Sequence, residues 1–222
     1  MNILITGENG FLATAFKDYF SKRYKVSCLG RNSLDFTDAG AVESFFNMNG
    51  YVDVIIHTAA DGGKRIRKDA FNTFSNNISM FSNLLQHKDK YGLMVCFGSG
   101  AEYDRQRPIM NVKEDEFIKC HPWDYYGLSK NIIAKEIAKE ELDFGDATIV
   151  NMRLFGCFGA GEDPQRFIKN SMNRVLEGKS ISVQNSMEMD FFYVDDLCTV
   201  IDFYIKNVDN IPLPREVNMV YE

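Results

Sequence analysis

The feature that most constrains the fold of this chain is a regular alternation between two kinds of segment. Continuous apolar runs, typical of strands buried on both faces, lie at residues 2–6, 24–29, 52–59, 92–99 and 147–155. Segments with apolar residues at helical spacing separate them, at residues 10–22, 38–48, 69–87 and 126–142. Strands and helices that alternate in this way form a parallel sheet with helices on both faces. The pattern therefore predicts an α/β fold with a Rossmann-type, doubly wound parallel sheet.

The alternation of strand-like and helix-like segments becomes less regular after residue 156, and the predicted domain boundary is placed there. Residues 1–156 are expected to form a dinucleotide-binding domain. Residues 157–222 are expected to form a small, partial substrate-binding region interleaved with the last strands of the sheet, with residues 160–190 capping an active site. The chain ends on a strand-like stretch, "EVNMVYE", with no helix after it. Because strands of such a sheet are normally covered by helices, we expect the chain to be incomplete at its C-terminus.

Charge and cysteine usage argue against several classes of protein. The chain has 25 basic and 31 acidic residues and a net charge of −6, whereas a nucleic-acid-binding protein needs a basic surface. No apolar stretch is long enough to cross a membrane, and the N-terminus does not resemble a signal peptide. Five scattered cysteines without a C-x-x-C pair, and three scattered histidines, predict reduced thiols and no metal site. We therefore expect a cytoplasmic protein that binds neither nucleic acid nor membrane.

A glycine-rich turn follows the first predicted strand, in the stretch "ITGENGFLATAF". Gly7, Gly10 and Ala13 have the spacing G-x-x-G-x-x-A, a variant of the dinucleotide fingerprint. The first glycine permits a tight turn, and the second lets backbone amides approach a pyrophosphate at the N-terminus of the helix. The alanine allows the helix to pack closely on the strand. The turn predicts a dinucleotide cofactor, bound by Gly7, Asn9, Gly10, Phe11 and Leu12.

The end of the second predicted strand bears on the choice of cofactor. An acidic residue at this place favours NAD, because it accepts hydrogen bonds from the ribose hydroxyls. Here the strand is followed by Gly30 and Arg31, and an arginine suits the 2′-phosphate of NADP. We therefore expect NADP in preference to NAD, the alternative being that Arg31 is a solvated loop residue. Asp35 and Phe36 follow, and we expect them to contact the adenine.

Two adjacent tyrosines in "WDYYGLSK" raise the question of whether one of them is an acid–base group. Residues four apart share one face of a helix, so Tyr126 faces Lys130, whereas Tyr125 faces Ser129. An ammonium beside a phenol favours the ionised phenol and suits it to exchange a proton with a carbinol oxygen. Tyr126 is therefore the predicted acid, and Tyr125 is predicted to pack or to line the substrate. Ser99 ends the preceding strand and is predicted to orient the reacting oxygen.

These motifs resemble those of the extended short-chain dehydrogenases/reductases, the NAD-dependent epimerase/dehydratase family of nucleotide-sugar enzymes. The resemblance runs through "TGENGFLA", "VDVIIHTAA", "NNISMFSNLL", "GSGAEY", "YYGLSK", "RLFGCFG" and "MDFFYVDDL". It is nearest to the GDP-fucose synthase and dTDP-4-dehydrorhamnose reductase types. The resemblance implies a nucleotide-sugar substrate and a homodimer built on the helices at 69–87 and 126–142.

The resemblance also assigns roles to individual residues. It implies a catalytic set of Ser99, Tyr126 and Lys130. It further implies that the cofactor is contacted by Ala59, Ala60 and Asn77, and by Tyr126 and Lys130 of the catalytic set.

The sequence departs from the family pattern at positions that bear on the substrate. GDP-fucose synthases have a cysteine two residues after the serine and a histidine in the following domain, for epimerisation. Here the first position is Ala101, and Arg166 lies near the second. The acid pair of the dehydratases is replaced by Gly100 and Ala101. Gly156 stands where the family often has an asparagine, and Met189 where it often has an arginine that holds the diphosphate. Ala101, Gly156 and Arg166 are therefore the candidate substrate positions.

The reaction that these features favour is reduction of a keto-sugar nucleotide by hydride transfer from NAD(P)H, with Tyr126 as the acid. One alternative is a nucleotide-sugar 4-epimerase with tightly bound NAD, which oxidises and then re-reduces its substrate. Another alternative is a cofactor-binding regulatory or scaffold protein without turnover. The absence of the asparagine at position 156 and of the arginine at position 189 supports this alternative.

Overall fold

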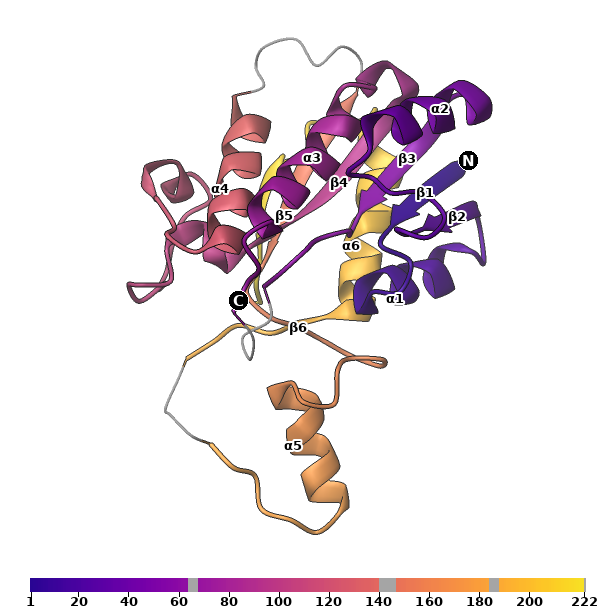
Figure 1. Cartoon of the computed structure of the whole chain (residues 1–222). Helices are drawn as coiled ribbons and strands as arrows, with labels where there is room; N and C mark the ends of the chain where they lie inside the picture. Colours follow the sequence, from indigo (N-terminus) through magenta and orange to yellow (C-terminus); the bar gives the residue numbers. More distant parts are fainter. Residues whose placement is uncertain (64–67, 140–146, 184–187, 222) are drawn as a thin grey trace.

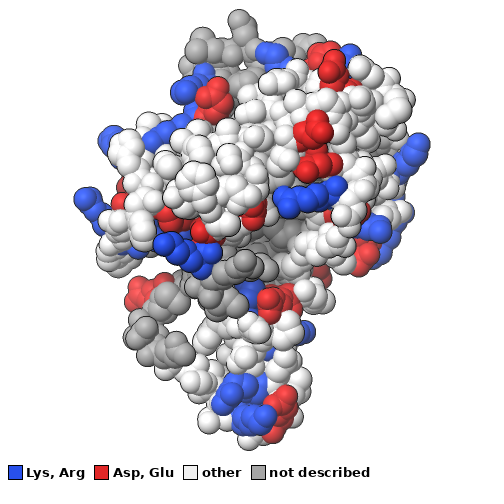
Figure 2. Space-filling view, viewed as in Figure 1, with Lys and Arg blue, Asp and Glu red and all other residues white. Residues whose placement is uncertain are grey.

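The computed structural model describes residues 1–63, 68–139, 147–183 and 188–221, and its centre is a parallel sheet between two layers of helices (Figure 1). No helix within these ranges is long and apolar enough to cross a membrane. Figure 2 shows acidic and basic side chains interspersed over the face in view, including the small lobe around α5.

Six parallel strands make the central sheet, in the order β2-β1-β3-β4-β5-β8. Their bounds are β1 Asn2–Thr6, β2 Lys25–Leu29, β3 Val52–His57, β4 Tyr91–Ser99, β5 Thr148–Leu154 and β8 Glu216–Met219. Side chains alternate between the faces: in β4, Val95 and Phe97 join one core cluster, and Met94 and Cys96 join the other. A strand covered by helices on both faces buries nearly every residue, which is why these segments are continuous apolar runs in the sequence.

The helices divide between the two faces of the sheet (Figure 1). One face is covered by α1 (Phe11–Phe20) and α6 (Val194–Asn207), and the other by α2 (Ala39–Asn49), α3 (Thr73–Leu85) and α4 (Tyr125–Ala138). Apolar residues at helical spacing make each contact, as in α1 and α6, where Phe16, Phe20, Leu197 and Ile201 are fully buried in one cluster.

The order of the strands creates a crevice at the carboxyl edge of the sheet. From β1 the chain moves to β2 on one side, and it then returns to β3 on the other side of β1. The helix after β1 covers one face and the helix after β3 covers the other, so the two loops separate. Ligands of open parallel sheets bind in such a crevice.

A smaller part of the chain is built on a pair of two-residue parallel strands, β6 (Cys157–Phe158) and β7 (Phe192–Tyr193). Between them, α5 (Phe167–Leu176) lies away from the central sheet (Figure 1), and none of its residues, all of which the structure describes, is buried. The chain then returns through α6 to β8 at the edge of the sheet, next to β5.

The predicted fold class is confirmed, and individual elements differ from their predicted bounds. The third helix was expected from residue 69 and begins at Thr73, because residues 68–70 have no regular structure and residues 71–72 form a turn; the Asp69 carboxylate accepts a hydrogen bond from the Gly63 amide (2.8 Å). Residues 140–146 of the helix predicted at 126–142 lie outside the described residues. The sequence did not predict α5, β6 or β7. The boundary at residue 156 stays a prediction.

Candidate cofactor and active site

The glycine turn joins β1 to α1 at the crevice. Gly7 has a φ of +82°, a left-handed conformation that favours glycine, and its amide donates to the carbonyl oxygen of Leu29 (2.7 Å). A β-carbon at Gly7 would lie 3.0 Å from the Cα of Ala59, in the loop after β3. A glycine at position 7 therefore lets the turn approach both neighbouring strands.

The N-terminus of α1 suits an anionic ligand. Its N-cap residue is Gly10, no side chain among the described residues caps it, and its first turn has no acidic residue. The amides of the first turn have no partner within the helix, and the helix dipole favours negative charge beside them. Asn9 and Gly10 are exposed there, and Phe11 and Leu12 are partly buried. The residues present therefore fit the pyrophosphate of a dinucleotide.

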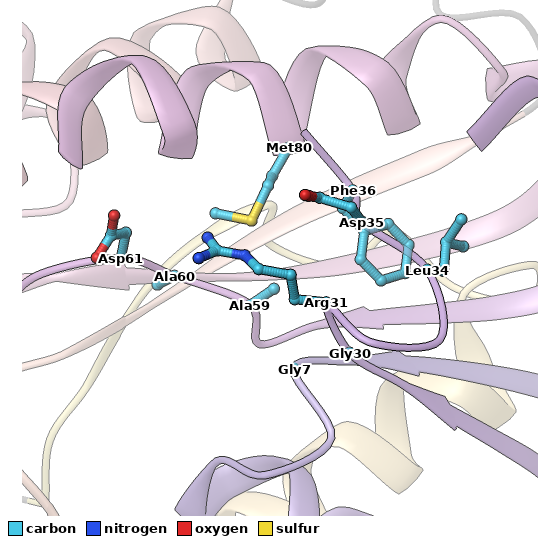
Figure 3. Close-up of a pocket in the computed structure, with 10 residues that line it drawn as sticks. All are labelled: Gly7, Gly30, Arg31, Leu34, Asp35, Phe36, Ala59, Ala60, Asp61 and Met80. Atoms are coloured by element: carbon cyan, nitrogen blue, oxygen red, sulfur yellow. The ribbon is translucent and has the colours of Figure 1, made fainter. Parts of the chain in front are cut away.

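A pocket of about 320 Å³ opens beside this turn (Figure 3). It brings together six of the predicted cofactor residues: Gly7, Arg31, Asp35, Phe36, Ala59 and Ala60. Gly30, Leu34, Asp61 and Met80 complete its lining. Figure 3 shows the Arg31 side chain extending across the pocket toward Ala60 and Met80. Its size and its place at the crevice fit the adenosine half of a dinucleotide.

Two carboxylates, those of Asp35 and Glu8, lie on the side of this pocket after β2. The Oδ1 of Asp35 accepts hydrogen bonds from the amide (2.9 Å) and the hydroxyl (2.7 Å) of Thr37, and these bonds lower the pKa of Asp35. Glu8, which the sequence did not single out, lies against Gly30, where a β-carbon would be 2.7 Å from the Glu8 Cγ. Its Oε2 accepts a long hydrogen bond from the Ser33 hydroxyl (3.4 Å). The side of the pocket after β2 therefore has charges of both signs.

Asn77 of α3 fastens the loop after β3 to α4. Its Oδ1 accepts from the Asp61 amide (2.7 Å), and its Nδ2 donates to the Asp61 carbonyl oxygen (3.0 Å) and to the Ser129 hydroxyl (2.9 Å). The side chain is buried, and both of its N–H groups are used in these contacts. Asn77 therefore holds the main chain of Asp61, a pocket residue, and its own predicted contact with the cofactor stays a prediction.

The two tyrosines of α4 lie in different surroundings. Tyr126 packs against the loop after β3: a β-carbon at Gly63 would lie 2.8 Å from the Cζ of its ring. The Lys130 ammonium lies 5.8 Å from the centroid of the same ring. Tyr125 is 39% exposed, and its ring meets Phe71 edge-on with 5.9 Å between the centroids. The helix therefore turns Tyr126 toward the loop that lines the pocket, and Tyr125 toward the outer surface of α3 and α4.

Lys130 is held at the carboxyl ends of β3 and β4. Its side chain is buried, and its Nζ donates to the carbonyl oxygen of Phe97 (2.8 Å). Burial, and secondly the charge of Lys130, lower the pKa of the nearby His57 to about 3, so that imidazole is neutral. The His57 Nδ1 lies 2.9 Å from the Thr6 hydroxyl oxygen. His57 therefore adds no positive charge beside Lys130 at this point of the sheet.

Ser99 is the last residue of β4, and a 3-10 helix (Gly100–Tyr103) comes directly after it. Its Oγ accepts from the Ala101 amide (3.2 Å), which leaves the hydroxyl proton for a ligand. Its own amide donates to the Oε1 of Glu102 (2.9 Å). Glu102 was not predicted from the sequence, although the spacing S-x-x-E is that of a capping box and could have identified it.

The three candidate substrate positions differ in what they offer a ligand. Ala101 is buried. Gly156 is also buried, and a β-carbon there would lie 2.9 Å from the Cε of Met189. Arg166 is exposed at the start of α5, with its Nε 3.0 Å from the Oε1 of Glu162. Of the three, Arg166 alone presents a polar side chain at the surface.

Comparison with known proteins identifies the family of this chain. The model of the NAD dependent epimerase/dehydratase family matches residues 3–219. A dTDP-D-glucose 4,6-dehydratase of Dictyostelium discoideum is 22% identical over 258 residues, which cover 97% of this chain and 59% of the dehydratase. The chain thus spans about three fifths of the length of this curated relative.

Solved structures share the fold at low sequence identity. A UDP-glucose 4-epimerase of Thermus thermophilus in complex with NAD has a TM-score of 0.77 at 20% identity, over 99% of this chain and 78% of the epimerase. A GDP-mannoheptose C4 reductase of Campylobacter jejuni with NADP bound has a TM-score of 0.76 at 18% identity, over 99% of this chain and 78% of the reductase. Since the family model covers almost the whole chain, the chain belongs to the NAD dependent epimerase/dehydratase family.

Proposed function

We propose that the protein is an NAD(P)-dependent oxidoreductase that reduces a keto group of a nucleotide-linked sugar. The observation that carries the proposal is the position of Tyr126. Asp61 lines the dinucleotide pocket, and Gly63, two residues further on, contacts the Tyr126 ring beside Lys130. Membership of the family supports the cofactor, and relatives described as acting on dTDP-, UDP- and GDP-linked sugars support the class of substrate.

In this proposal each residue has a defined task. The cofactor, when bound, supplies the hydride that reduces the carbonyl carbon. Tyr126 donates its phenol proton to the carbonyl oxygen, which becomes a hydroxyl group, and the Lys130 charge stabilises the phenolate that remains. The Ser99 hydroxyl donates a hydrogen bond to the same oxygen. The amides at the start of α1 hold the pyrophosphate of the cofactor.

Reduction is favoured over dehydration by the residues directly after Ser99. Gly100 and Ala101 supply no acid or base, and the carboxylate of Glu102 is fully buried and paired with Arg153. A 4-epimerase would use the same hydroxyl, phenol and ammonium, and it differs by consuming no cofactor. Net oxidation of NADPH therefore separates the two reactions.

The test compares the two tyrosines in purified protein with a panel of dTDP-, UDP- and GDP-linked 4-keto sugars. We expect wild type to oxidise one NADPH per sugar reduced. Tyr126→Phe should lower kcat by about a hundredfold or more, because it removes the acid. Tyr125→Phe is the matched control and should stay within about threefold of wild type. Equal losses in both variants, interconversion without net NADPH oxidation, or cofactor binding without turnover would each contradict the proposal.

We propose NADP as the preferred cofactor. The support is Arg31, which is exposed and reaches across the pocket (Figure 3). The nearby Glu8 carboxylate argues against NADP, because its negative charge would repel a 2′-phosphate. Arg31→Ala should weaken NADPH binding by about tenfold or more, because a charge-assisted hydrogen bond to a phosphate is lost, and should change NADH binding by less than about threefold. Fluorescence titration measures both constants. Equal losses for the two cofactors would show that Arg31 does not recognise a 2′-phosphate.

We also propose a homodimer through α3 and α4. The support is apolar surface on these helices: Phe71, just before α3, is exposed, as are Tyr125 and Ile132, which lie seven residues apart on one face of α4. Sedimentation should give a dimer for wild type and a monomer for Ile132→Glu with unchanged secondary structure. A wild-type monomer at micromolar concentration would contradict the proposal.

A further inference from the structure

The turn that carries Ser99 is held by a buried carboxylate. The Oε1 of Glu102 accepts the hydrogen bond of the Ser99 amide (2.9 Å), and its Oε2 pairs with the Nε of Arg153. Both charged side chains are 0% exposed. Because apolar residues of similar volume often replace a buried ion pair without loss of stability, stability alone does not account for this pair. Its place, directly beside the last residue of β4, suggests a role in shaping the site.

Residues of β4 and β5 make room for the Glu102 carboxylate and bind it. A side chain at Gly98 would overlap the Glu102 Oε1 and would lie 2.6 Å from the Oδ1 of Asn151. Asn151 of β5 donates a long hydrogen bond to the Glu102 Oε2 (3.4 Å). The Arg153 guanidinium lies 4.0 Å from the centroid of the Phe117 ring. Glycine in β4 thus leaves room for the carboxylate, and β5 supplies its countercharge.

The same turn is tied to the helix that carries Tyr126. Asn131, the residue after Lys130, donates through its Nδ2 to the backbone carbonyl oxygen of Glu102 (2.9 Å). Glu102 therefore contacts Ser99 through its side chain and α4 through its main chain. Glu102 thus links the turn that carries Ser99 to the helix that carries Tyr126 and Lys130.

We infer that Glu102 is a positioning residue that fixes the Ser99 hydroxyl relative to Tyr126 and Lys130, and that Arg153 holds it in place. The inference rests on the proposed function, which gives Ser99 its task. Glu102 cannot touch a substrate, because its side chain is fully buried. Its loss should slow the chemical step and leave cofactor binding intact, since the adenosine pocket lies at β1, β2 and β3.

The direct test is Glu102→Gln, which removes the charge with almost no change in volume. We expect a kcat about tenfold to a hundredfold lower, with the KM for the keto-sugar nucleotide and the Kd for NADPH within about threefold of wild type. The matched control is Glu136→Gln, which removes an exposed ion pair with Lys139 (3.0 Å) on α4 and should leave kcat unchanged. An unchanged kcat in Glu102→Gln, or a loss confined to the Kd of NADPH, would overturn the inference.

A double-mutant cycle with Ser99→Ala decides whether the effect passes through Ser99. In the Ser99→Ala background, Glu102→Gln should lower kcat by less than about threefold, because no hydroxyl remains to be misplaced. If the two losses multiply, Glu102 acts independently of Ser99 and the inference is wrong. Should Glu102→Gln fail to fold, Gly98→Ala perturbs the same carboxylate and enters the same cycle.

Hydrogen exchange separates this inference from the proposed function. Glu102→Gln should speed exchange of the Ser99 amide, which loses its charged acceptor, and should leave the amides of α1 unchanged. Unchanged exchange at Ser99 overturns the positioning role. If wild type reduces no keto-sugar nucleotide, the proposed function fails, whereas faster exchange at Ser99 in the variant still supports Glu102 as the residue that orders this turn.

Discussion

Glu216 of β8 shares the Arg153 guanidinium with Glu102, and this sharing predicts how stability depends on pH. One guanidinium faces two carboxyl groups, so it cannot compensate the charge of both when both are ionised. Burial raises the pKa of Glu216 from 4.5 to about 7; Arg153 opposes the shift and Glu102 reinforces it. The Glu216 Oε1 is buried, and no described residue donates a hydrogen bond to it. The folded protein therefore keeps a proton on Glu216 at pH values where the unfolded chain has released it.

The size and sign of the effect follow from these two pKa values. One pKa unit corresponds to about 1.4 kcal/mol, so the full span from 4.5 to about 7 is worth about 3.5 kcal/mol, of which about 3 kcal/mol falls between about pH 4.5 and 8. This contribution is fully present below the unfolded-state pKa of Glu216 and is lost as the pH rises through about 7. Glu216→Gln carries no titrating group, so its stability lacks this dependence.

Equilibrium urea unfolding, followed by circular dichroism between about pH 4.5 and 8, measures the difference between wild type and Glu216→Gln. We expect wild type to lose up to about 3 kcal/mol relative to the variant across this range. Glu177→Gln, which removes an exposed ion pair with Lys179, is the control and should give a curve parallel to wild type. A wild type that gains stability over Glu216→Gln as the pH rises would refute the reasoning, because attraction to Arg153 would then outweigh burial.

Two glycines give further predictions. Gly7→Ala should lower the free energy of unfolding by about 1–3 kcal/mol and weaken cofactor binding, because φ is +82° and the new methyl would lie 3.0 Å from the Ala59 Cα. Thermal unfolding and cofactor titration measure both effects, and an unchanged cofactor Kd would argue against the turn as part of the site. Gly63→Ala should lower kcat at least tenfold, since its methyl would displace the Tyr126 ring. Gly178→Ala is the control: its φ of +68° is similar, no neighbour lies within 4 Å of the new methyl, and kcat should not change.

The sequence predicted the central sheet well because its signal is strong there. Strands β1, β3, β4 and β5 are buried on both faces, so each appears as a continuous apolar run whose ends are clear within one or two residues. The short pair β6 and β7 has two residues in each strand, too few for any periodic pattern. Helix α5 buries none of its residues, yet Ile168, Met172 and Val175 have helical spacing, so the sequence signal for this helix was present and was missed.

The candidate site was predictable where chemistry depends on local spacing. The glycine turn and the Tyr126–Lys130 pair are read from a few consecutive residues. The structure has the turn at the start of α1 and the Lys130 ammonium 5.8 Å from the Tyr126 ring centroid, and the roles of these residues stay predictions. The role of Asn77 depends on a loop and a helix 16 and 52 residues away in the chain, which no local pattern reveals. The Glu102–Arg153 pair joins residues 51 apart; the S-x-x-E spacing marks Glu102 and a buried strand contains Arg153, but no local pattern reveals that the two form a pair.

Gly156 and Met189 occupy neighbouring space, and this has a bearing on any attempt to graft a relative's sugar site onto the chain. A β-carbon at 156 would lie 2.9 Å from the Met189 Cε and 2.9 Å from the Phe191 ring. An asparagine introduced at 156 alone would collide with the segment that follows α5. The two departures from the family pattern therefore depend on each other, and a transplant of a relative's sugar site has to exchange residues 156 and 189 together.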